Sequence, residues 1–303
     1  MAMLELRSHD QRAGNVLARV ALSGLPTMRV LLLAPAILLV FGFVIGPTVI
    51  ALVESFRSGQ SWTVANYITV LTEPPYPGIF WNTVVIALWT TLASMAISLP
   101  AAAFLAAQSS RWAGIIMGLI ASTLWISILV KSYAWQVLLG MRGPVNDLLL
   151  SLHLTERPVP LLYTRGAVLI SMVQFMIPYA CILLVSGMRK VDWELITAAR
   201  VLGARTSTVF RTVYWPQVRF TVVMTALIVF VIASSFFVAP ALLGGPGETM
   251  LGMKMKSDLS ARYDSGLAAT TGTLLTLALL IISWIALKLT GSSFRRATEE
   301  VSR

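Results

Sequence analysis

The chain has 303 residues, of which 57% are hydrophobic and only 12% are charged, and its formal net charge is +10. A soluble globular domain averages about 25% charged residues, so this composition excludes that class and indicates an integral membrane protein. The single cysteine, Cys181, rules out an intrachain disulfide. The two histidines, His9 and His153, lie far apart in the sequence and predict no metal cluster.

Six apolar stretches are long enough to cross the hydrocarbon core as helices, which takes roughly 20 residues each. Continuous apolar runs favour helices over a β-barrel, because the strands of a barrel alternate in hydrophobicity. We therefore predict an all-α integral membrane protein with six transmembrane helices in a domain at 30–290. The predicted spans are 30–53, 79–108, 112–140, 166–188, 220–241 and 265–288.

Lysine and arginine predict the orientation of these spans. If the N-terminus is cytosolic, most of the 23 lysine and arginine residues fall on the cytosolic side, as the positive-inside rule requires. We therefore expect cytosolic tails at 1–29 and 291–303 and a protein surrounded by membrane lipid. The net charge then follows from topology, so it does not indicate a nucleic-acid partner.

Two longer connections are expected on the outer side. The first, 141–165, starts with the turn Gly143-Pro144 and is expected to form a short helix at 145–154. The second starts with a glycine-rich stretch at 243–248 and continues as a polar loop through 254–264. Glu54, Asp258 and Asp264 are expected to be solvated surface charges, and contact with a binding protein or attraction of cations is the alternative.

The polar segment 189–219 between the fourth and fifth spans is the most informative part of the chain. Asp192 is suited to cap a helix, and Glu194 then lies in the first turn, where the positive end of the helix favours a carboxylate. Gly203 can take the left-handed conformation that ends a helix. A second short helix is expected from Thr206 until Pro216.

This helix, glycine turn and helix would present a surface to a cytosolic partner. Ala198 and Ala199 would allow a close approach, and Arg200 and Arg205 would meet acidic groups. An interfacial linker whose arginines contact anionic lipid explains the same residues equally well.

The segment resembles the signature of binding-protein-dependent ABC transporter permeases, which is Glu-Ala-Ala, three residues, glycine, nine residues and Ile-x-Leu-Pro. The same spacing separates Thr197-Ala-Ala from Gly203 and from Val213-Tyr-Trp-Pro. Thr197 replaces the glutamate of the signature, which removes any ion pair that the glutamate makes, and Glu194 is a candidate substitute. The chain from about 30 to 289 is also similar to the spermidine/putrescine branch, through the stretches 133–135, 143–146 and 236–246.

The resemblance implies the fold of a type I ABC importer permease, in which this segment is a coupling helix that docks on a cytosolic ATPase. The chain would then be a non-catalytic subunit in the bacterial inner membrane. Its partners would be ATPase subunits in two copies, a second homologous permease and an extracytoplasmic solute-binding protein. The implied coupling residues are Glu194, Thr197, Ala198, Ala199, Arg200, Gly203, Arg205 and Pro216.

The implied solute is a polyamine such as spermidine or putrescine, and another small organic or cationic solute is the alternative. ATP and Mg²⁺ would bind to the partner, since this sequence has no Gly-x-x-x-x-Gly-Lys-[Ser/Thr] phosphate loop. A self-sufficient secondary transporter or channel is the rival function. It would be expected to bury several charges for ion coupling, whereas the predicted spans hold only Lys131. An enzyme is disfavoured, because the spans contain no cluster of catalytic residue types.

Polar and aromatic residues in the third to fifth spans are candidates for a solute path, since the faces of aromatic rings attract ammonium groups. Helix packing is the alternative interpretation of each residue. Lys131 is expected to snorkel towards the outer surface, or to face a partner or backbone carbonyls. The path candidates are Tyr133, Trp135, Gln136, Gln174, Tyr179, Ser235 and Phe236.

Overall fold

The computed structural model describes residues 35, 38–59, 61–108 and 110–301, with side chains described as far as Lys288. Apart from strands β1 (Arg57–Ser58) and β2 (Ser61–Trp62), which pair antiparallel, the regular structure in this part of the chain is helical. The chain divides into two compact units, Met1–Glu54 and Ser55–Arg303. The tail predicted at 1–29 lies outside the described residues, as does the start of the first predicted span at 30–34.

The first unit contains an apolar helix, Leu38–Glu54, which corresponds to most of the predicted span 30–53. A π-helical segment, η1 (Phe41–Ile45), precedes α3 (Gly46–Glu54). Pro47 would clash with the carbonyl four residues earlier in a regular α-helix. The wider π turn immediately before it makes room for the ring, so the helix continues through the proline.

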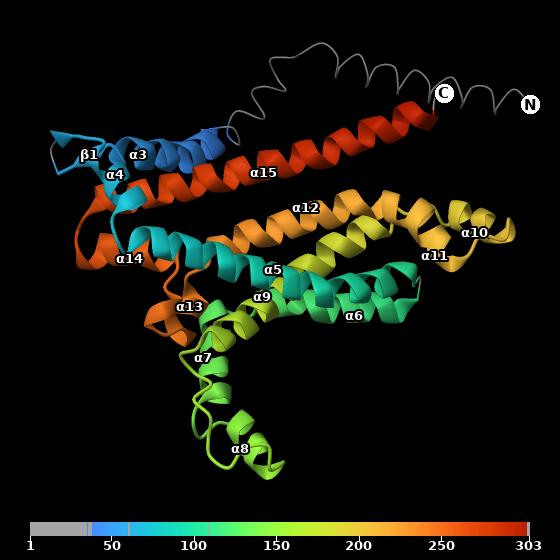
Figure 1. Cartoon of the computed structure of the whole chain (residues 1–303), viewed down its shortest axis with the longest axis horizontal. Helices are drawn as coiled ribbons and strands as arrows, with labels where there is room; N and C mark the ends of the chain where they lie inside the picture. Colours follow the sequence, from blue (N-terminus) through green and yellow to red (C-terminus); the bar gives the residue numbers. More distant parts are fainter. Residues whose placement is uncertain (1–34, 36–37, 60, 109, 302–303) are drawn as a thin grey trace, which may run out of the picture. The chain divides into compact units, whose positions relative to one another are not determined.

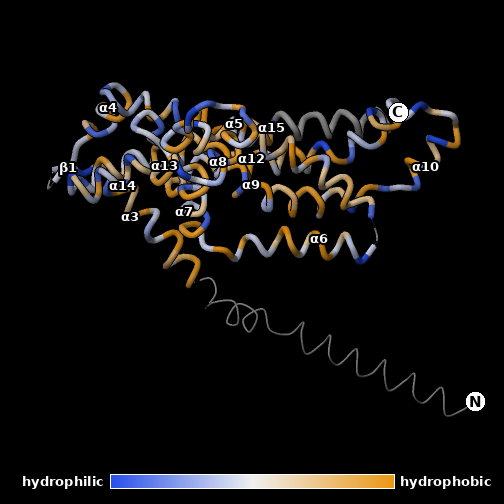
Figure 2. The backbone as a smooth tube through the Cα atoms, turned by 90° about the horizontal axis from the view of Figure 1, so that it is seen from below, coloured by the Kyte–Doolittle hydropathy of each residue, from blue (hydrophilic) through white to orange (hydrophobic). Residues whose placement is uncertain are grey.

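Four helices in the second unit are long and apolar enough to cross a membrane: α5 (Tyr76–Ala107), α9 (Arg165–Met188), the helix Thr206–Ser234 and the Ser265–Lys288 part of α15 (Ser265–Val301). The helix Thr206–Ser234 consists of α11 (Thr206–Val209), the π-helical η3 (Phe210–Tyr214) and α12 (Trp215–Ser234). α5, α9 and α12 pack against one another (Figure 1). Their residues are mainly hydrophobic, and hydrophilic residues gather at the connections (Figure 2).

The predicted third span, 112–140, is broken and not continuous. α6 (Arg111–Ser122) and the 3₁₀ turn η2 (Thr123–Trp125) are followed by α7 (Ile128–Leu139), and the two helical parts meet at an angle of 94°. The hydroxyls of Ser122 and Thr123 donate to Leu119 O at 2.8 Å and Ile120 O at 2.7 Å, where they compete with the helical ladder. The described residues therefore provide four spans, or five with this bent pair, and the count of six stays a prediction.

The predicted fifth span, 220–241, also ends early, because α12 stops at Ser234. A second short helix, α13 (Val238–Leu243), follows after a break at 235–237. Pro240 lacks the N–H that would bond to the carbonyl of Phe236, so a regular helix cannot run through the break. The break places Phe236 and Phe237 between two helices.

The connections predicted on the outer side contain more helix than expected. The short helix expected at 145–154 is present as α8 (Pro144–Ser151), whereas α4 (Ala65–Thr72) was not expected. The polar stretch expected as a loop is a helix, α14 (Leu251–Ala261), preceded by the 3₁₀ turn η4 (Pro246–Glu248). Its first residue, Leu251, is 2% exposed, so the helix has an apolar face that packs against the chain. The charged residues of this stretch led to the prediction of a loop.

Asp258 of α14 is fully buried, which corrects the prediction of a solvated charge. Lys254, one helical turn earlier, forms an ion pair with its carboxylate, and the hydroxyl of Tyr76 donates to Oδ2 at 3.0 Å. The ring of Tyr76 also lies 4.6 Å below the Lys254 ammonium. The phenol belongs to α5, far away in sequence, so the sequence pattern of α14 alone does not reveal it.

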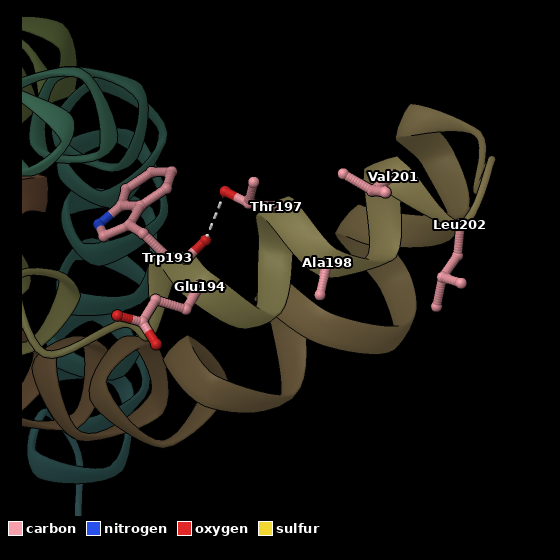
Figure 3. Close-up of a pocket in the computed structure, with 6 residues that line it drawn as sticks. All are labelled: Trp193, Glu194, Thr197, Ala198, Val201 and Leu202. Carbon is pink, nitrogen blue, oxygen red and sulfur yellow. Dashed lines mark hydrogen bonds between the residues drawn. The ribbon is translucent and has the colours of Figure 1, made fainter.

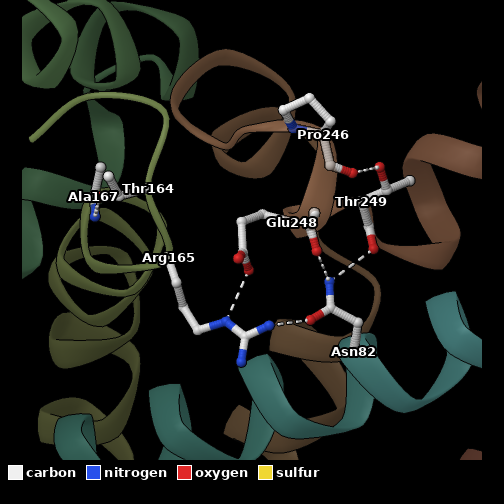
Figure 4. A network of polar contacts seen from close by, with 8 residues as sticks. Asn82, Thr164, Arg165, Ala167, Pro246, Glu248 and Thr249 are labelled. Atoms are coloured by element: carbon white, nitrogen blue, oxygen red, sulfur yellow. Dashed lines mark hydrogen bonds and ion pairs between the residues drawn. The ribbon is translucent and has the colours of Figure 1, made fainter. Parts of the chain in front are cut away.

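A polar network fixes the same end of the bundle (Figure 4). Arg165, the first residue of α9, donates to Glu248 at 2.9 Å and to Asn82 of α5 at 2.7 Å. Asn82 in turn donates to the carbonyls of Gly247 and Thr249 at 3.2 and 3.0 Å. Three segments that are distant in sequence are thus joined at the end of the helices opposite to α10 (Trp193–Val201) (Figure 1).

The stretch 143–146 closes the connection between α7 and α8. Asn146 is fully buried, and its amide donates to the carbonyls of Gly140 and Val159 at 3.0 Å each. Its Oδ1 accepts from the Val159 N–H at 2.8 Å. A Cβ on Gly143 would lie 2.4 Å from the Val137 carbonyl oxygen, so the turn requires glycine for space.

Candidate functional site

The segment 189–219, which we call the coupling segment, begins as predicted. Asp192 caps α10, and its Oδ1 accepts the backbone N–H groups of Glu194 at 2.9 Å and Leu195 at 3.4 Å. Glu194 lies in the first turn, where the helix dipole favours its charge. A short helix of nine residues is marginal in isolation, so this cap contributes to keeping it formed.

Gly203 ends α10, as predicted. Its φ is +82°, and its N–H donates to Arg200 O at 3.0 Å, while the N–H of Ala204 donates to Ala199 O at 3.1 Å. These two bonds are the pattern of the Schellman motif. Nothing lies within 4 Å of a Cβ built on Gly203, so backbone conformation and not space requires glycine here.

The outer face of α10 is exposed and largely apolar. It borders an open hollow of about 590 Å³, lined by Trp193, Glu194, Thr197, Ala198, Val201 and Leu202 (Figure 3). Val201 is 81% exposed and Leu202 is 87% exposed. Large apolar side chains that are this exposed mark a surface for contact with another protein or with membrane lipid.

The inner face of α10 packs against the chain itself. Ile196 is 4% exposed, and Ala199 packs against the hydrophobic core, so only Ala198 of the two alanines is on the outer face. Ala199 is partly exposed and turns more towards the chain than Ala198 does, because adjacent helical residues point about 100° apart. The hydroxyl of Thr197 donates to its own helix, to Trp193 O at 2.9 Å, so it does not stand in for a carboxylate (Figure 3). Glu194 lines the same hollow and provides the negative charge there.

The second helix of the coupling segment does not end at Pro216, which corrects the prediction. It continues from Thr206 to Ser234, and Pro216 lies in the first turn of α12, directly after the π segment η3. Trp215 N–H donates to Phe210 O, five residues earlier. The wider turn accommodates the proline ring, as it does at Pro47, so the helix that begins in the coupling segment continues into α12 without a break.

Aromatic and polar contacts join α10 to the start of α12. The ring of Trp193 lies 6.5 Å from that of Tyr214, and Phe210 stacks on Tyr214 at 5.7 Å. The N–H of Asp192 donates to Gln217 Oε1 at 2.9 Å. Arg200 lines a smaller cavity of about 290 Å³ between these elements, whereas Arg205 is exposed at the start of α11.

The helices on either side of the coupling segment touch directly. A Cβ on Gly187, near the end of α9, would lie 2.3 Å from the side chain of Thr221 in α12. Glycine therefore permits the two helices to approach closely just beyond the coupling segment.

Four of the path candidates make contacts that join α7, α9 and the segment after α12. Trp135 Nε1 of α7 donates to Gln174 Oε1 of α9 at 3.0 Å. Phe236, in the break after α12, packs with its ring 5.3 Å from that of Phe175 in α9. Gln136 donates to the carbonyl of Leu242 at 2.7 Å and so joins α7 to α13.

The remaining candidates lie elsewhere. Tyr133 and Tyr179 are 57% and 40% exposed on the surface of this chain, and the hydroxyl of Ser235 donates to Val231 O in its own helix at 3.2 Å. Sequence reasoning missed Phe175, because one phenylalanine in an apolar span carries no distinguishing signal. Lys131, expected to snorkel outwards or to face a partner or backbone carbonyls, is 8% exposed, and its ammonium lies 5.1 Å from the Phe175 ring centroid.

The chain is similar to several known permeases. The PotB permease of the Haemophilus influenzae spermidine/putrescine transport system is 30% identical over 248 residues, which cover 79% of this chain and 86% of PotB. The PotB of Escherichia coli is 28% identical over 231 residues, or 75% of this chain and 84% of its own. No protein-family model matches.

Solved structures share the fold. A chain of a bacterial alginate ABC transporter, in complex with a periplasmic protein, superposes with a TM-score of 0.74 at 16% identity, covering 87% of this chain and 93% of that one. A chain of the MetNI methionine ABC transporter gives 0.53 over 71% of this chain and 94% of that chain. Together with the identity to PotB over most of both chains, the fold and the coupling segment lead to one conclusion: this chain belongs to the permease family of ABC importers, in its spermidine/putrescine branch.

Proposed function

We propose that this chain forms, together with a second homologous permease, the path of an ATP-driven importer for a polyamine such as spermidine or putrescine. As a permease it is a non-catalytic membrane subunit. ATP and Mg²⁺ would bind to two partner ATPase subunits, and an extracytoplasmic binding protein would deliver the solute. The chain would lie in the bacterial inner membrane with both termini in the cytosol.

The outer face of α10 is the observation that carries this proposal. It combines exposed Val201 and Leu202 with Glu194 on a short helix that is capped at both ends. A rigid apolar projection of this kind suits a groove on another protein. ATP-driven closure of that protein can bias the spans between two states only if its contacts with α10 differ between those states.

Aromatic and amide groups support an ammonium-bearing solute. The rings of Phe175 and Phe236 pack together, and the Gln174 carbonyl oxygen, which accepts from Trp135, belongs to the residue next to Phe175 in α9. Ring faces attract cations, and a carbonyl oxygen accepts their N–H groups. The substrate class named by the PotB relatives has the same chemistry.

Leu202→Glu tests the coupling role. The side chain is 87% exposed, so the substitution leaves the fold intact but places a charge where an apolar contact is proposed. We expect the ATPase to stop co-purifying and ATP-driven putrescine uptake to fall about tenfold or more, as loss of one central apolar anchor does at an interface. Leu154→Glu, at a residue 66% exposed after α8, is the matched control and should change neither.

Unchanged co-purification and uptake in the Leu202→Glu protein would contradict the docking surface. Uptake by the purified chain without any ATPase would contradict the importer itself and favour a self-sufficient transporter.

A further inference from the structure

Lys131 is a buried cation without a carboxylate partner. It lies in the first turn of α7, and its backbone N–H donates to Ser127 O at 3.1 Å. Its side chain is 8% exposed. Among the residues whose side chains the structure describes, none forms an ion pair with it. A lone charge inside a span is costly and usually marks a functional position.

The contact that the structure gives this ammonium is an aromatic face. Lys131 Nζ lies 5.1 Å from the centroid of the Phe175 ring, within the range of a cation–π interaction. Phe175 is 4% exposed, so a solute can reach that face only after Lys131 moves. The face of the Phe175 ring is therefore suited to bind an ammonium group, and the Lys131 ammonium occupies it.

The surroundings complete an aromatic site for amines. Phe236 packs on Phe175 at 5.3 Å between centroids, and Trp135 donates to Gln174, the residue directly before Phe175 in α9. An aromatic face in contact with a cation is a known way to recognise ammonium groups. These elements come from α7, α9 and the break after α12, which meet here.

We propose that Phe175 forms an ammonium-binding subsite of the solute path, and that Lys131 occupies this subsite while no solute is present. The inference rests on the proposed import of an amine. Exchange of one ammonium for another leaves the charge at the Phe175 face constant, and each further ammonium of a polyamine has to lie elsewhere along the path. The long lysine stem, next to the break before α7, allows the displaced ammonium to move towards a polar surface.

Lys131→Met tests this exchange, and it removes a buried charge from a span, so insertion should not suffer. We expect the assembled importer, without nucleotide, to bind putrescine about tenfold more tightly, since the tethered competitor is gone. The affinity for the neutral analogue 1,4-butanediol should not change. Lys288→Met is the matched control, because the Lys288 ammonium lies 3.9 Å from the Trp284 centroid on an exposed part of α15.

A second variant tests the ring directly. A trifluorinated phenylalanine at 175 keeps the shape of the ring but weakens its negative face, so in the Lys131→Met background it should abolish the gain in putrescine binding. The proposal is overturned if the Lys131→Met importer binds putrescine with the affinity of the wild type. It is also overturned if Lys288→Met raises that affinity as much, or if the fluorinated ring leaves the higher affinity of Lys131→Met unchanged. ATP-driven uptake by the wild type is measured in parallel. Uptake without any Lys131 effect rejects only this inference, whereas absence of uptake rejects the proposed function.

Discussion

At the scale of single residues, Gly203 is required by its backbone conformation alone. Gly203→Ala would place a Cβ at a φ of +82°, which costs about 1 kcal/mol or more, although nothing lies within 4 Å of the new atom. We expect the amides that close α10 to lose about fivefold or more of their hydrogen-exchange protection. Gly247→Ala is the control, because that glycine has equal space and no positive φ. Equal effects of the two substitutions would refute a conformational role.

The buried pair of Lys254 and Asp258 makes a second prediction at this scale. Asp258→Asn leaves a lysine that is 7% exposed without its counter-charge, and we expect a loss of about 3 kcal/mol or more in unfolding free energy. Arg262, whose Nε lies 3.8 Å from the Asp258 carboxylate, loses the same partner, but its side chain is 57% exposed and stays solvated. The double variant Lys254→Met/Asp258→Leu should recover most of the loss, as measured by thermal unfolding in detergent. Failure of the double variant to recover would show that Asp258 acts chiefly through Tyr76.

At the scale of elements, α10 depends on its cap. Asp192→Ala removes the acceptor for two backbone N–H groups and should destabilise the helix by about 1 kcal/mol, seen as faster hydrogen exchange at Glu194 and Leu195. Asp192→Asn keeps an oxygen in the same place and should leave exchange nearly unchanged. If hydrogen exchange is equally fast in both variants, the negative charge of Asp192, and not its capping hydrogen bonds, stabilises the first turn.

Local signals in the sequence predicted the elements that depend on local chemistry. Asp192 and Gly203 marked the two ends of α10, and the apolar run matched α9 to within one residue of its start. The break before α7 contains no proline or glycine, and the hydroxyl bonds of Ser122 and Thr123 to their own helix also occur in unbroken helices of this chain, so the sequence carries no signal for it. The continuation through Pro216 was missed because a π turn leaves no local signature.

The candidate site could be predicted where the spacing of residues within one segment defines a motif. It could not be predicted where residues that are distant in sequence meet. The coupling segment was found from one motif, whereas the contacts of Lys131 with Phe175 and of Tyr76 with Asp258 join helices that are separate in sequence. The apolar residues around Lys131 predict that it lies within a span, but its contact partner depends on how α7 and α9 pack. Ala199 shows the same limit, because its inward direction depends on the orientation of α10 against the core.

At the scale of the whole molecule, the orientation in the membrane is the testable property. Cys181 is 1% exposed, so replacing it by alanine gives a background without thiols. In that background a membrane-impermeant maleimide should label Arg157→Cys in intact spheroplasts, and it should label Arg205→Cys only after the membrane is opened. The reverse pattern would put the coupling segment outside and exclude docking on a cytosolic ATPase.

The contact between Gly187 and Thr221 has a mechanical consequence. Gly187 and Thr221 each lie two residues beyond the coupling segment, so α9 and α12 are closely packed where the chain enters and leaves it. We expect this packing to make the two helices tilt together when α10 is displaced, and α12 ends beside the break that contains Phe236.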